Sequence, residues 1–189
     1  MTLRSNRRHK RVVVRHLQVF ASLEWSGIIL TLVKGMTSVI QVTGGEDLRQ
    51  VQSLFEEYAA SLNFDLCFQG FDEELASLPG DYIPPEGRLL LALRTGEPAG
   101  CAALRKFDNG VCEMKRLYVR PWFRRLGIGR TLAETIVSEA RQIGYKRMCL
   151  DTVPSMQQAQ FLYQSMGFRD VEPYRYNPIC GTRFMEFVL

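Results

Sequence analysis

The stretch Arg124-Arg125-Leu126-Gly127-Ile128-Gly129-Arg130 separates a predicted strand, residues 111–119, from a predicted helix, residues 127–143. The first turn of a helix offers unpaired backbone N–H groups and the positive end of the helix dipole. Glycine lets an anion approach the backbone closely, and the three arginines of this stretch add positive charge. The stretch therefore predicts a binding site for a pyrophosphate group.

Two common pyrophosphate motifs do not fit this stretch. A Walker loop needs Lys followed by Ser or Thr after its last glycine, whereas Arg130-Thr131 stands here after a spacing that is too short. The dinucleotide fingerprint G-x-G-x-x-G fails at its third glycine, where the chain has Leu132. A different class of pyrophosphate ligand is indicated.

The pattern Arg124-x-x-Gly127-x-Gly129 resembles the coenzyme A motif of the GNAT superfamily of acyl-CoA-dependent N-acyltransferases. The preceding residues 113–121 and the later pattern Ala159-x-x-Leu162-Tyr163-x-x-x-Gly167-Phe168 strengthen the resemblance, and the order of elements agrees with it. The resemblance covers residues 38–189 and is densest over 111–168. Residues 173–178 and 184–186 look like those of small microbial members.

Periodicity and turn residues outside the motif predict a single α/β domain. The resemblance implies a mixed, mostly antiparallel central sheet, flanked by helices, whose parallel strands 111–119 and 146–152 splay apart at the acyl-CoA site. Ser155 and Gln158 predict a capping box for the helix that follows. Strands are predicted at 38–43, 88–94, 99–107, 111–119, 146–152, 168–176 and 182–189, and helices at 46–62, 71–78, 127–143 and 155–166.

The resemblance also implies how acetyl-CoA, the co-substrate, is held. The backbone amides from Arg125 through Leu126, Gly127, Ile128 and Gly129 to Arg130 would bind its pyrophosphate, beside Arg124. The edge of the strand at Leu117, Tyr118 and Val119 would pair with the pantetheine arm. The N–H of Val119 could then polarise the acetyl carbonyl as an oxyanion-hole donor.

Two residues are candidates for proton transfer, because the chain after residue 35 contains no histidine. Tyr163 falls on the family position that protonates the leaving thiolate, and its alternative role is core packing. Glu113 stands six residues before Val119, so that alternation predicts both side chains on one face, as in members with a general-base Glu. Pairing of Glu113 with Lys115 or Arg116 is the alternative, and both interpretations stay open.

The expected reaction is direct attack of a primary amine on acetyl-CoA in a ternary complex, because no residue is available to activate a cysteine. The acceptor is a small-molecule amine or a peptide amine, and the acidic residues between 55 and 86 would suit a cation or only face solvent. A catalytically silent acyl-CoA-binding or regulatory module is one alternative. A nucleic-acid-binding protein is another, and a homodimer stays open.

The net charge of +4 divides the chain of 189 residues into two unlike parts. Residues 1–35 carry seven Lys and Arg against one Glu, whereas the remaining chain carries 17 positive and 19 negative side chains. We interpret 1–35 as a basic N-terminal extension, produced by over-extended translation ahead of Met36, and 36–189 as the N-acetyltransferase domain. The five cysteines form no CxxC pair, which favours buried thiols in the cytoplasm, and we expect neither a metal site nor a membrane span.

Overall fold

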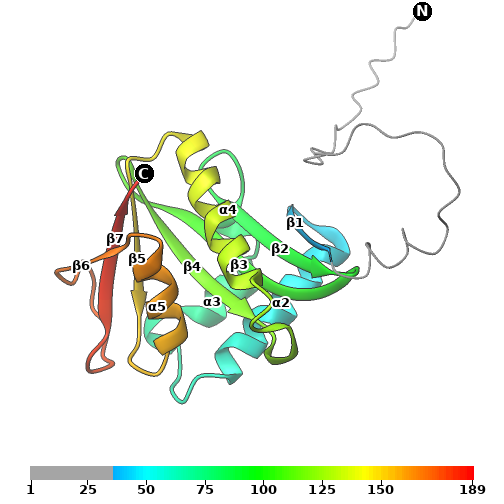
Figure 1. Cartoon of the computed structure of the whole chain (residues 1–189), viewed down its shortest axis with the longest axis horizontal. Helices are drawn as coiled ribbons and strands as arrows, with labels where there is room; N and C mark the ends of the chain where they lie inside the picture. Colours follow the sequence, from blue (N-terminus) through cyan, green and yellow to red (C-terminus); the bar gives the residue numbers. More distant parts are fainter. Residues whose placement is uncertain (1–35) are drawn as a thin grey trace, which may run out of the picture.

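The computed structural model describes residues 36–189, so the predicted basic extension and the nucleic-acid interpretation attached to it lie outside the described residues. Most predicted elements are confirmed, with boundaries shifted by one or two residues (Figure 1). The strands are β1 (Thr37–Gln41), β2 (Arg88–Arg94), β3 (Glu97–Asp108), β4 (Val111–Val119), β5 (Arg147–Thr152), β6 (Arg169–Val171) and β7 (Arg183–Val188). The helices are α2 (Gly45–Ala60), α3 (Phe71–Ser77), α4 (Ile128–Ile143) and α5 (Gln157–Ser165), with short 3₁₀ turns at Cys67–Gln69, Gly80–Tyr82 and Pro121–Phe123.

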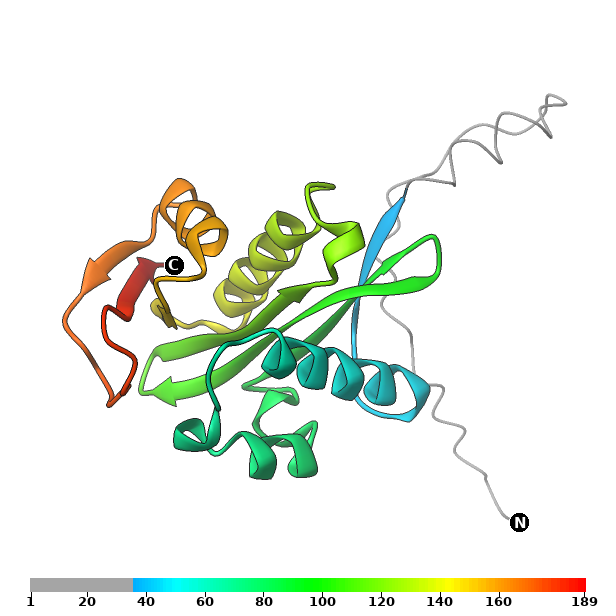
Figure 2. The same cartoon turned by 90° about the horizontal axis from the view of Figure 1, so that it is seen from below.

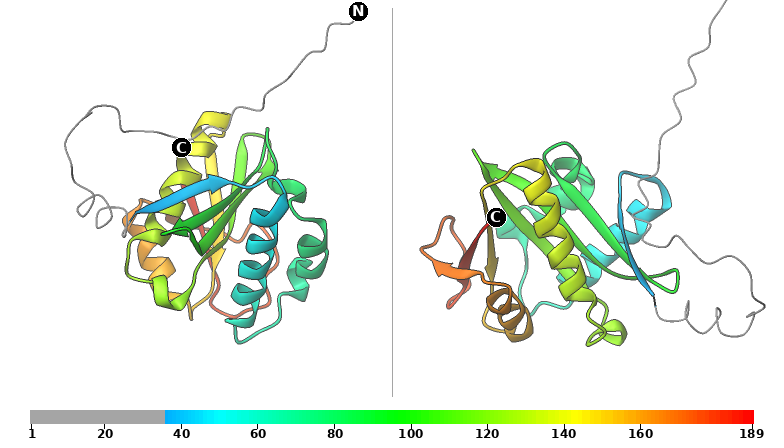
Figure 3. Two further views of the ribbon diagram at one scale, coloured as in Figure 1. Left: turned by 90° about the vertical axis from the view of Figure 1, so that its right-hand side faces the viewer. Right: turned by 45° about the horizontal axis from the view of Figure 1, so that its top comes forward.

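The strands form one seven-stranded sheet in the order β1-β2-β3-β4-β5-β7-β6, with β1 and β6 at its edges (Figure 3). Every neighbouring pair is antiparallel except β4 and β5, which run parallel. Helices α2 and α3 cover one face of the sheet, and α4 and α5 cover the other (Figure 2). The predicted mixed, mostly antiparallel sheet flanked by helices is confirmed.

Strand β2 shows why the sheet needs helices on both faces. Leu89 and Leu91 are buried among the side chains on the α2 and α3 face, whereas Leu90 and Ala92 are buried on the α4 and α5 face. Burying one such leucine contributes about 1.5–3 kcal/mol, so a strand that is apolar on both faces is stable only between two layers. Helix α4 packs on its face of the sheet through six buried side chains, those of Ile128, Leu132, Ala133, Ile136, Val137 and Ala140.

The parallel strands separate early, as expected. Register between β4 and β5 extends only from Val111 opposite Arg147 to Glu113 opposite Cys149. Beyond these pairs the two strands diverge and leave a gap, which widens toward the bottom of Figure 1. The carboxyl-terminal half of β4 therefore presents a backbone edge that β5 does not cover.

A bulge in β4 lies beside this gap. The pairing with β3 shifts by one residue between Cys101 opposite Tyr118 and Ala103 opposite Lys115, and Arg116 has a positive φ of 55°. A left-handed backbone at a residue other than glycine costs about 1–3 kcal/mol and persists where surrounding contacts hold it. On β3, Gly100 lies opposite Val119, just beyond the bulge, and a side chain there would collide with the carbonyl oxygen of Tyr118.

The bulge corrects one expectation from the sequence. Glu113 and Val119 lie on opposite faces, because the extra residue inverts the alternation of side chains along the strand. Val119 packs on the α4 and α5 face with Leu117, whereas Tyr118 packs on the α2 and α3 face. The prediction that Glu113 and Val119 lie on one face of the strand is therefore wrong.

Two local expectations near the carboxyl terminus were also wrong. Helix α5 begins after Met156, and no side chain caps it, so the capping box of Ser155 and Gln158 does not form. Strand β6 ends at Val171, well short of the predicted strand 168–176. Pro173 lacks the N–H that a paired strand would donate, and the following loop crosses toward β4 and β5 instead.

Candidate active site

The glycine turn lies at the N-terminus of α4, as the sequence predicts. Gly127 precedes the helix with a φ of 80°, a conformation that glycine adopts at little cost, and Arg125 also has a positive φ of 64°. The backbone hydrogen bonds of the described residues use none of the N–H groups of residues 125 to 130 as donors. Six consecutive free N–H groups at the start of a 16-residue helix form a cradle for an anion.

The three arginines of the turn have different positions. The Nε of Arg124 donates to the carbonyl oxygen of Val119 at 3.0 Å. Arg130 reaches toward α5, where it donates to the hydroxyl of Ser165 at 2.7 Å. Arg125 is exposed. Arg124 and Arg130 thus tie the turn to β4 and α5, on either side of the gap, as well as contributing positive charge.

The bond from Arg124 also indicates which way Val119 faces. The N–H of Arg120 donates to Ala99 on β3, so the backbone groups of the preceding residue point away from β3. The carbonyl of Val119 accordingly meets Arg124 instead of a strand partner. The N–H of Val119 therefore faces the gap, where the oxyanion donor was expected.

Tyr163 lies on α5 and faces the gap from the α4 and α5 side. Its side chain is 7% exposed and packs against Phe168 with ring centroids 5.6 Å apart. Burial raises the pKa of its phenol well above the usual value, with smaller contributions from Tyr58 and Asp151. The hydroxyl is therefore protonated at neutral pH and can donate a hydrogen bond. Tyr163 has the core contacts considered from the sequence and also lines the cavity at the gap, and its role in catalysis stays a prediction.

A cavity passes through the sheet at the gap between β4 and β5. Its lining includes Met114, Leu117 and Tyr163, which belong to the core on the α4 and α5 face. It also includes Tyr58 and Leu66, from the core on the other face. The two faces of the sheet thus communicate at this point, beside the free edge of β4. The polar lining residues are Gln69, Lys115, Arg116, Asp151, Thr152 and Asn177.

Glu113 does not line this cavity. Its side chain is fully buried, and its two oxygens contact two arginines: Arg105 at 2.9 Å and Arg175 at 2.8 Å. The hydroxyl of Tyr174 donates to the same carboxylate at 3.2 Å. The ion-pair interpretation from the sequence is therefore favoured over the base, although the partners are not the expected Lys115 and Arg116.

Arg175 and Asp151 are the residues that sequence reasoning missed. Arg175 comes from the loop after β6 and contacts both Glu113 on β4 and Asp151 on β5, so it bridges the diverging strands. Asn177 donates to the other oxygen of Asp151 at 2.8 Å. Asp151 is the carboxylate among the residues that line the cavity. In the sequence, residues 173–178 stand out only for their resemblance to small microbial members and as the end of a predicted strand, and Asp151 only as part of the predicted strand 146–152.

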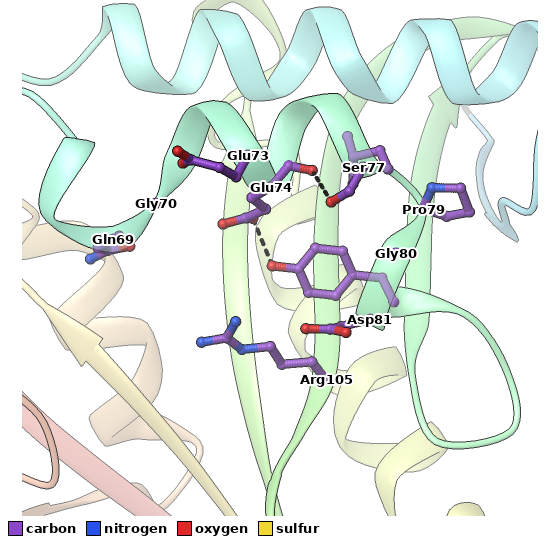
Figure 4. A pocket seen from close by; sticks show the side chains of 11 residues that line it. Gln69, Gly70, Glu73, Glu74, Ser77, Pro79, Gly80, Asp81 and Arg105 are labelled. Atoms are coloured by element: carbon purple, nitrogen blue, oxygen red, sulfur yellow. Dashed lines mark hydrogen bonds between the residues drawn. The ribbon is translucent and has the colours of Figure 1, made fainter.

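A larger cavity, of about 320 Å³, lies on the α2 and α3 side (Figure 4). It touches none of the predicted cofactor or catalytic residues, but Gln69 lines both cavities. Glu74 accepts hydrogen bonds at its edge from Tyr82, at 2.6 Å, and from Arg116, at 2.9 and 2.6 Å. The acidity expected between residues 55 and 86 is thus partly neutralised, because Glu57 also pairs with Arg120.

The five cysteines are free thiols. Burial raises the pKa of Cys112 and of Cys149 to about 12, and it raises the pKa of the fully buried Cys101 further. These three thiols are therefore protonated at neutral pH and are poor nucleophiles. Cys67 and Cys180 are exposed and do not line either cavity.

Residues 36–189 show neither a cluster of metal ligands nor a helix that could span a membrane. No three His, Cys, Asp or Glu side chains of this part of the chain gather closely enough to hold a metal ion. Its helices are all too short or too polar to cross a lipid bilayer.

A family model, a sequence relative and a solved structure that match this chain are all acetyltransferases. The model of the acetyltransferase (GNAT) family matches residues 51–168. An N-acetyltransferase of Schizosaccharomyces pombe is 41% identical over 151 residues, which cover 79% of this chain and 93% of the relative. An acetyltransferase from Streptococcus agalactiae superposes with a TM-score of 0.67 at 21% identity, over 81% of this chain and 98% of the other.

The structural neighbours include proteins solved with acetyl-CoA. A GNAT family acetyltransferase from Elizabethkingia anophelis, solved with acetyl-CoA bound, has a TM-score of 0.59 and 24% identity. The superposition covers 81% of this chain and 98% of that structure. At this level of identity the likeness concerns the fold.

Proposed function

Because the chain belongs to the GNAT family of acetyltransferases, with acetyl-CoA as co-substrate, we propose that it transfers the acetyl group directly to a primary amine in a ternary complex. The observation that carries the proposal is the cavity through the sheet, which brings the free edge of β4 and Tyr163 together with Asp151. The catalytic domain in this proposal is 36–189, of which the family model matches 51–168.

The cofactor would lie on the α4 and α5 side of the gap. Its pyrophosphate would accept hydrogen bonds from the free N–H groups of residues 125 to 130, with Arg124 and Arg130 nearby. Its pantetheine arm would extend along the uncovered edge of β4 at Leu117, Tyr118 and Val119. The Val119 N–H, which faces the gap, would then stabilise negative charge that develops on the acetyl oxygen.

Two side chains of the cavity would handle the protons. The amine arrives as an ammonium ion, gives one proton to solvent and attacks the acetyl carbon. Asp151 takes the second proton from the nitrogen as the tetrahedral intermediate forms. The hydroxyl of Tyr163 donates a hydrogen bond to the sulfur, and it protonates the thiolate when the carbon–sulfur bond breaks. We assign Glu113 a positioning role, since its side chain is fully buried and lines neither cavity, whereas Asp151 is partly exposed and lines the cavity at the gap.

Direct transfer is supported by the protonation of the buried cysteine thiols. A route through an acetylated cysteine needs a thiolate, and burial raises the pKa of both Cys112 and Cys149, to about 12. The free thiols are also typical of a reducing compartment, which supports a location in the cytoplasm.

The decisive experiment measures release of coenzyme A from acetyl-CoA against a panel of primary amines. The panel contains polyamines, amino acids, aminoglycosides and lysine peptides. We expect release that depends on one class of amine, together with a matching N-acetylated product. Binding of acetyl-CoA without release on any amine would instead identify the catalytically silent acyl-CoA-binding module.

Replacement of Gly129 by Ala tests the anion cradle. A Cβ at this position lies 3.7 Å from the nearest side chain, so the fold accommodates it, and alanine favours a helix by about 1 kcal/mol over glycine. The methyl group would hold the pyrophosphate away from the backbone, and we expect the Kd for acetyl-CoA to rise about tenfold, the equivalent of one charged hydrogen bond. Calorimetric titration with acetyl-CoA measures the effect.

The matched control is Ser138→Ala, an exposed position farther along the same helix. Its Kd for acetyl-CoA should equal that of the wild type. An unchanged Kd in Gly129→Ala would place the pyrophosphate elsewhere.

A further inference from the structure

The charged residues beside the gap leave one cation without an acidic partner. Arg105 and Arg175 share Glu113, and Arg175 also contacts Asp151. Arg116 forms two hydrogen bonds with Glu74. Four cations, including Lys115, thus face three carboxylates, and none of the ion pairs among residues 36–189 includes Lys115.

Lys115 is buried, which is unusual for a charged side chain that forms no ion pair. The residue is only 6% exposed, and its ammonium has one hydrogen-bond acceptor, the Oε1 of Gln69 at 3.4 Å. An ammonium group carries three donors, so most of its bonding capacity is unused at a site where charge is costly. A buried cation with unused donors indicates that an anion completes the site when the protein works.

The position of Lys115 indicates which of the two substrates carries that anion. Lys115 and Gln69 line the cavity that also contains Tyr163 and Asp151, and Gln69 continues into the larger cavity on the α2 and α3 side. The cofactor pyrophosphate is expected at the start of α4, on the opposite face of the sheet. The anion at Lys115 therefore belongs to the acceptor.

We propose that the acceptor is an amino acid or a closely related amine that carries a carboxylate, and that Lys115 binds this carboxylate. The inference rests on the proposed acetyl transfer and narrows its substrate class. Gln69 orients the lysine, and the amine of the same molecule points toward Tyr163 and the acetyl carbon.

The protonation state of Lys115 is compatible with this role. Burial, and then the neighbouring Arg116, lower its pKa to about 8, whereas Glu113 and Glu74 act in the opposite direction. The ammonium form still predominates at neutral pH. A bound carboxylate would raise the pKa of Lys115 again, since an opposite charge at close range favours the charged form.

The test compares amino acids with the amines that lack their carboxylate. Phenylalanine is paired with phenethylamine, leucine with 3-methylbutylamine, and the other protein amino acids likewise with their decarboxylated forms. Coenzyme A release is measured for wild type, Lys115→Met, Lys115→Arg and the exposed control Lys106→Met. We expect release with amino acids, and a loss of about 100-fold in kcat/KM in Lys115→Met, the size expected when a buried charge pair loses one partner.

Three controls separate binding from other roles. Lys115→Arg should retain a large part of the activity, Lys106→Met all of it, and Lys115→Met should keep the wild-type Tm because an apolar side chain replaces an unpaired buried charge. The ratio of kcat/KM for an amino acid to kcat/KM for its decarboxylated amine should fall in Lys115→Met and stay at the wild-type value in Lys106→Met. In addition, an N-acetylated amino acid plus coenzyme A should raise the Tm of the wild type but not that of Lys115→Met.

The outcomes distinguish the two proposals. If decarboxylated amines are better acceptors than amino acids, acetyl transfer stands and the carboxylate site is overturned. If Lys115→Met lowers kcat equally for both members of a pair, Lys115 acts on protons and does not recognise the carboxylate. If no amine at all releases coenzyme A and no N-acetylated amino acid raises the Tm, both the proposed transfer and the carboxylate site are overturned.

Discussion

Tyr163→Phe is expected to lower kcat about 100-fold while leaving the Kd for acetyl-CoA close to that of the wild type, because general acid catalysis contributes about 10²–10⁴ to a rate. The substitution removes only the hydroxyl. The ring still packs against Phe168, and α5 keeps its place over the gap. The loss should therefore appear in the chemical step, where the thiolate leaves without a proton donor.

The matched control is Tyr145→Phe. Tyr145 is also a buried tyrosine, and its hydroxyl donates to the carbonyl oxygen of Glu86 at 2.9 Å, but it lines neither cavity. Its loss should lower the free energy of unfolding by about 1 kcal/mol without changing kcat. Both variants are assayed at saturating substrates, and Tm is recorded for each. An undiminished kcat in Tyr163→Phe would restrict Tyr163 to packing.

Glu113→Gln is expected to act on stability, with a loss of about 3 kcal/mol in the free energy of unfolding at neutral pH. Removing one partner of a buried ion pair typically costs about 3–5 kcal/mol, because the remaining charge stays buried without compensation. Here Arg105 loses its partner, and Arg175 keeps only Asp151. Denaturant unfolding measures the change, and kcat of the folded variant should stay within a few-fold of the wild type.

Asp151→Asn provides the contrasting result. Asp151 lines the cavity and is 12% exposed; an asparagine there keeps one oxygen to accept from Arg175 or Asn177 but cannot accept a proton from the amine. We expect a smaller loss of stability than in Glu113→Gln and a decrease of about 100-fold in kcat. The opposite pattern, with Glu113→Gln folded but inactive and Asp151→Asn active, would return the base to Glu113.

The sequence placed Tyr163 correctly and Glu113 incorrectly, because the position of Tyr163 depends on local sequence and that of Glu113 does not. Tyr163 was assigned because it matches the family's pattern of residues 159–168, and α5 forms where that pattern lies. The placement of Glu113 depended on alternation through Arg116, and a bulge there inverts which residues share a face. A bulge arises from contacts with another strand and with Glu74, so periodicity within β4 could not reveal it.

The sequence by itself determined the elements, the turn that forms the anion cradle and the need for helices on both faces of the sheet. These follow from short-range physics: glycine before a helix, the apolar run of β2 and the stripe of α4. Only the tertiary structure decided how the polar side chains are paired. Arg175 reaches Glu113 and Asp151 from a loop far along the chain, and Lys115 is left buried with Gln69 alone. Charges are balanced between residues distant in sequence, so the unpaired lysine could be recognised only after the chain had folded.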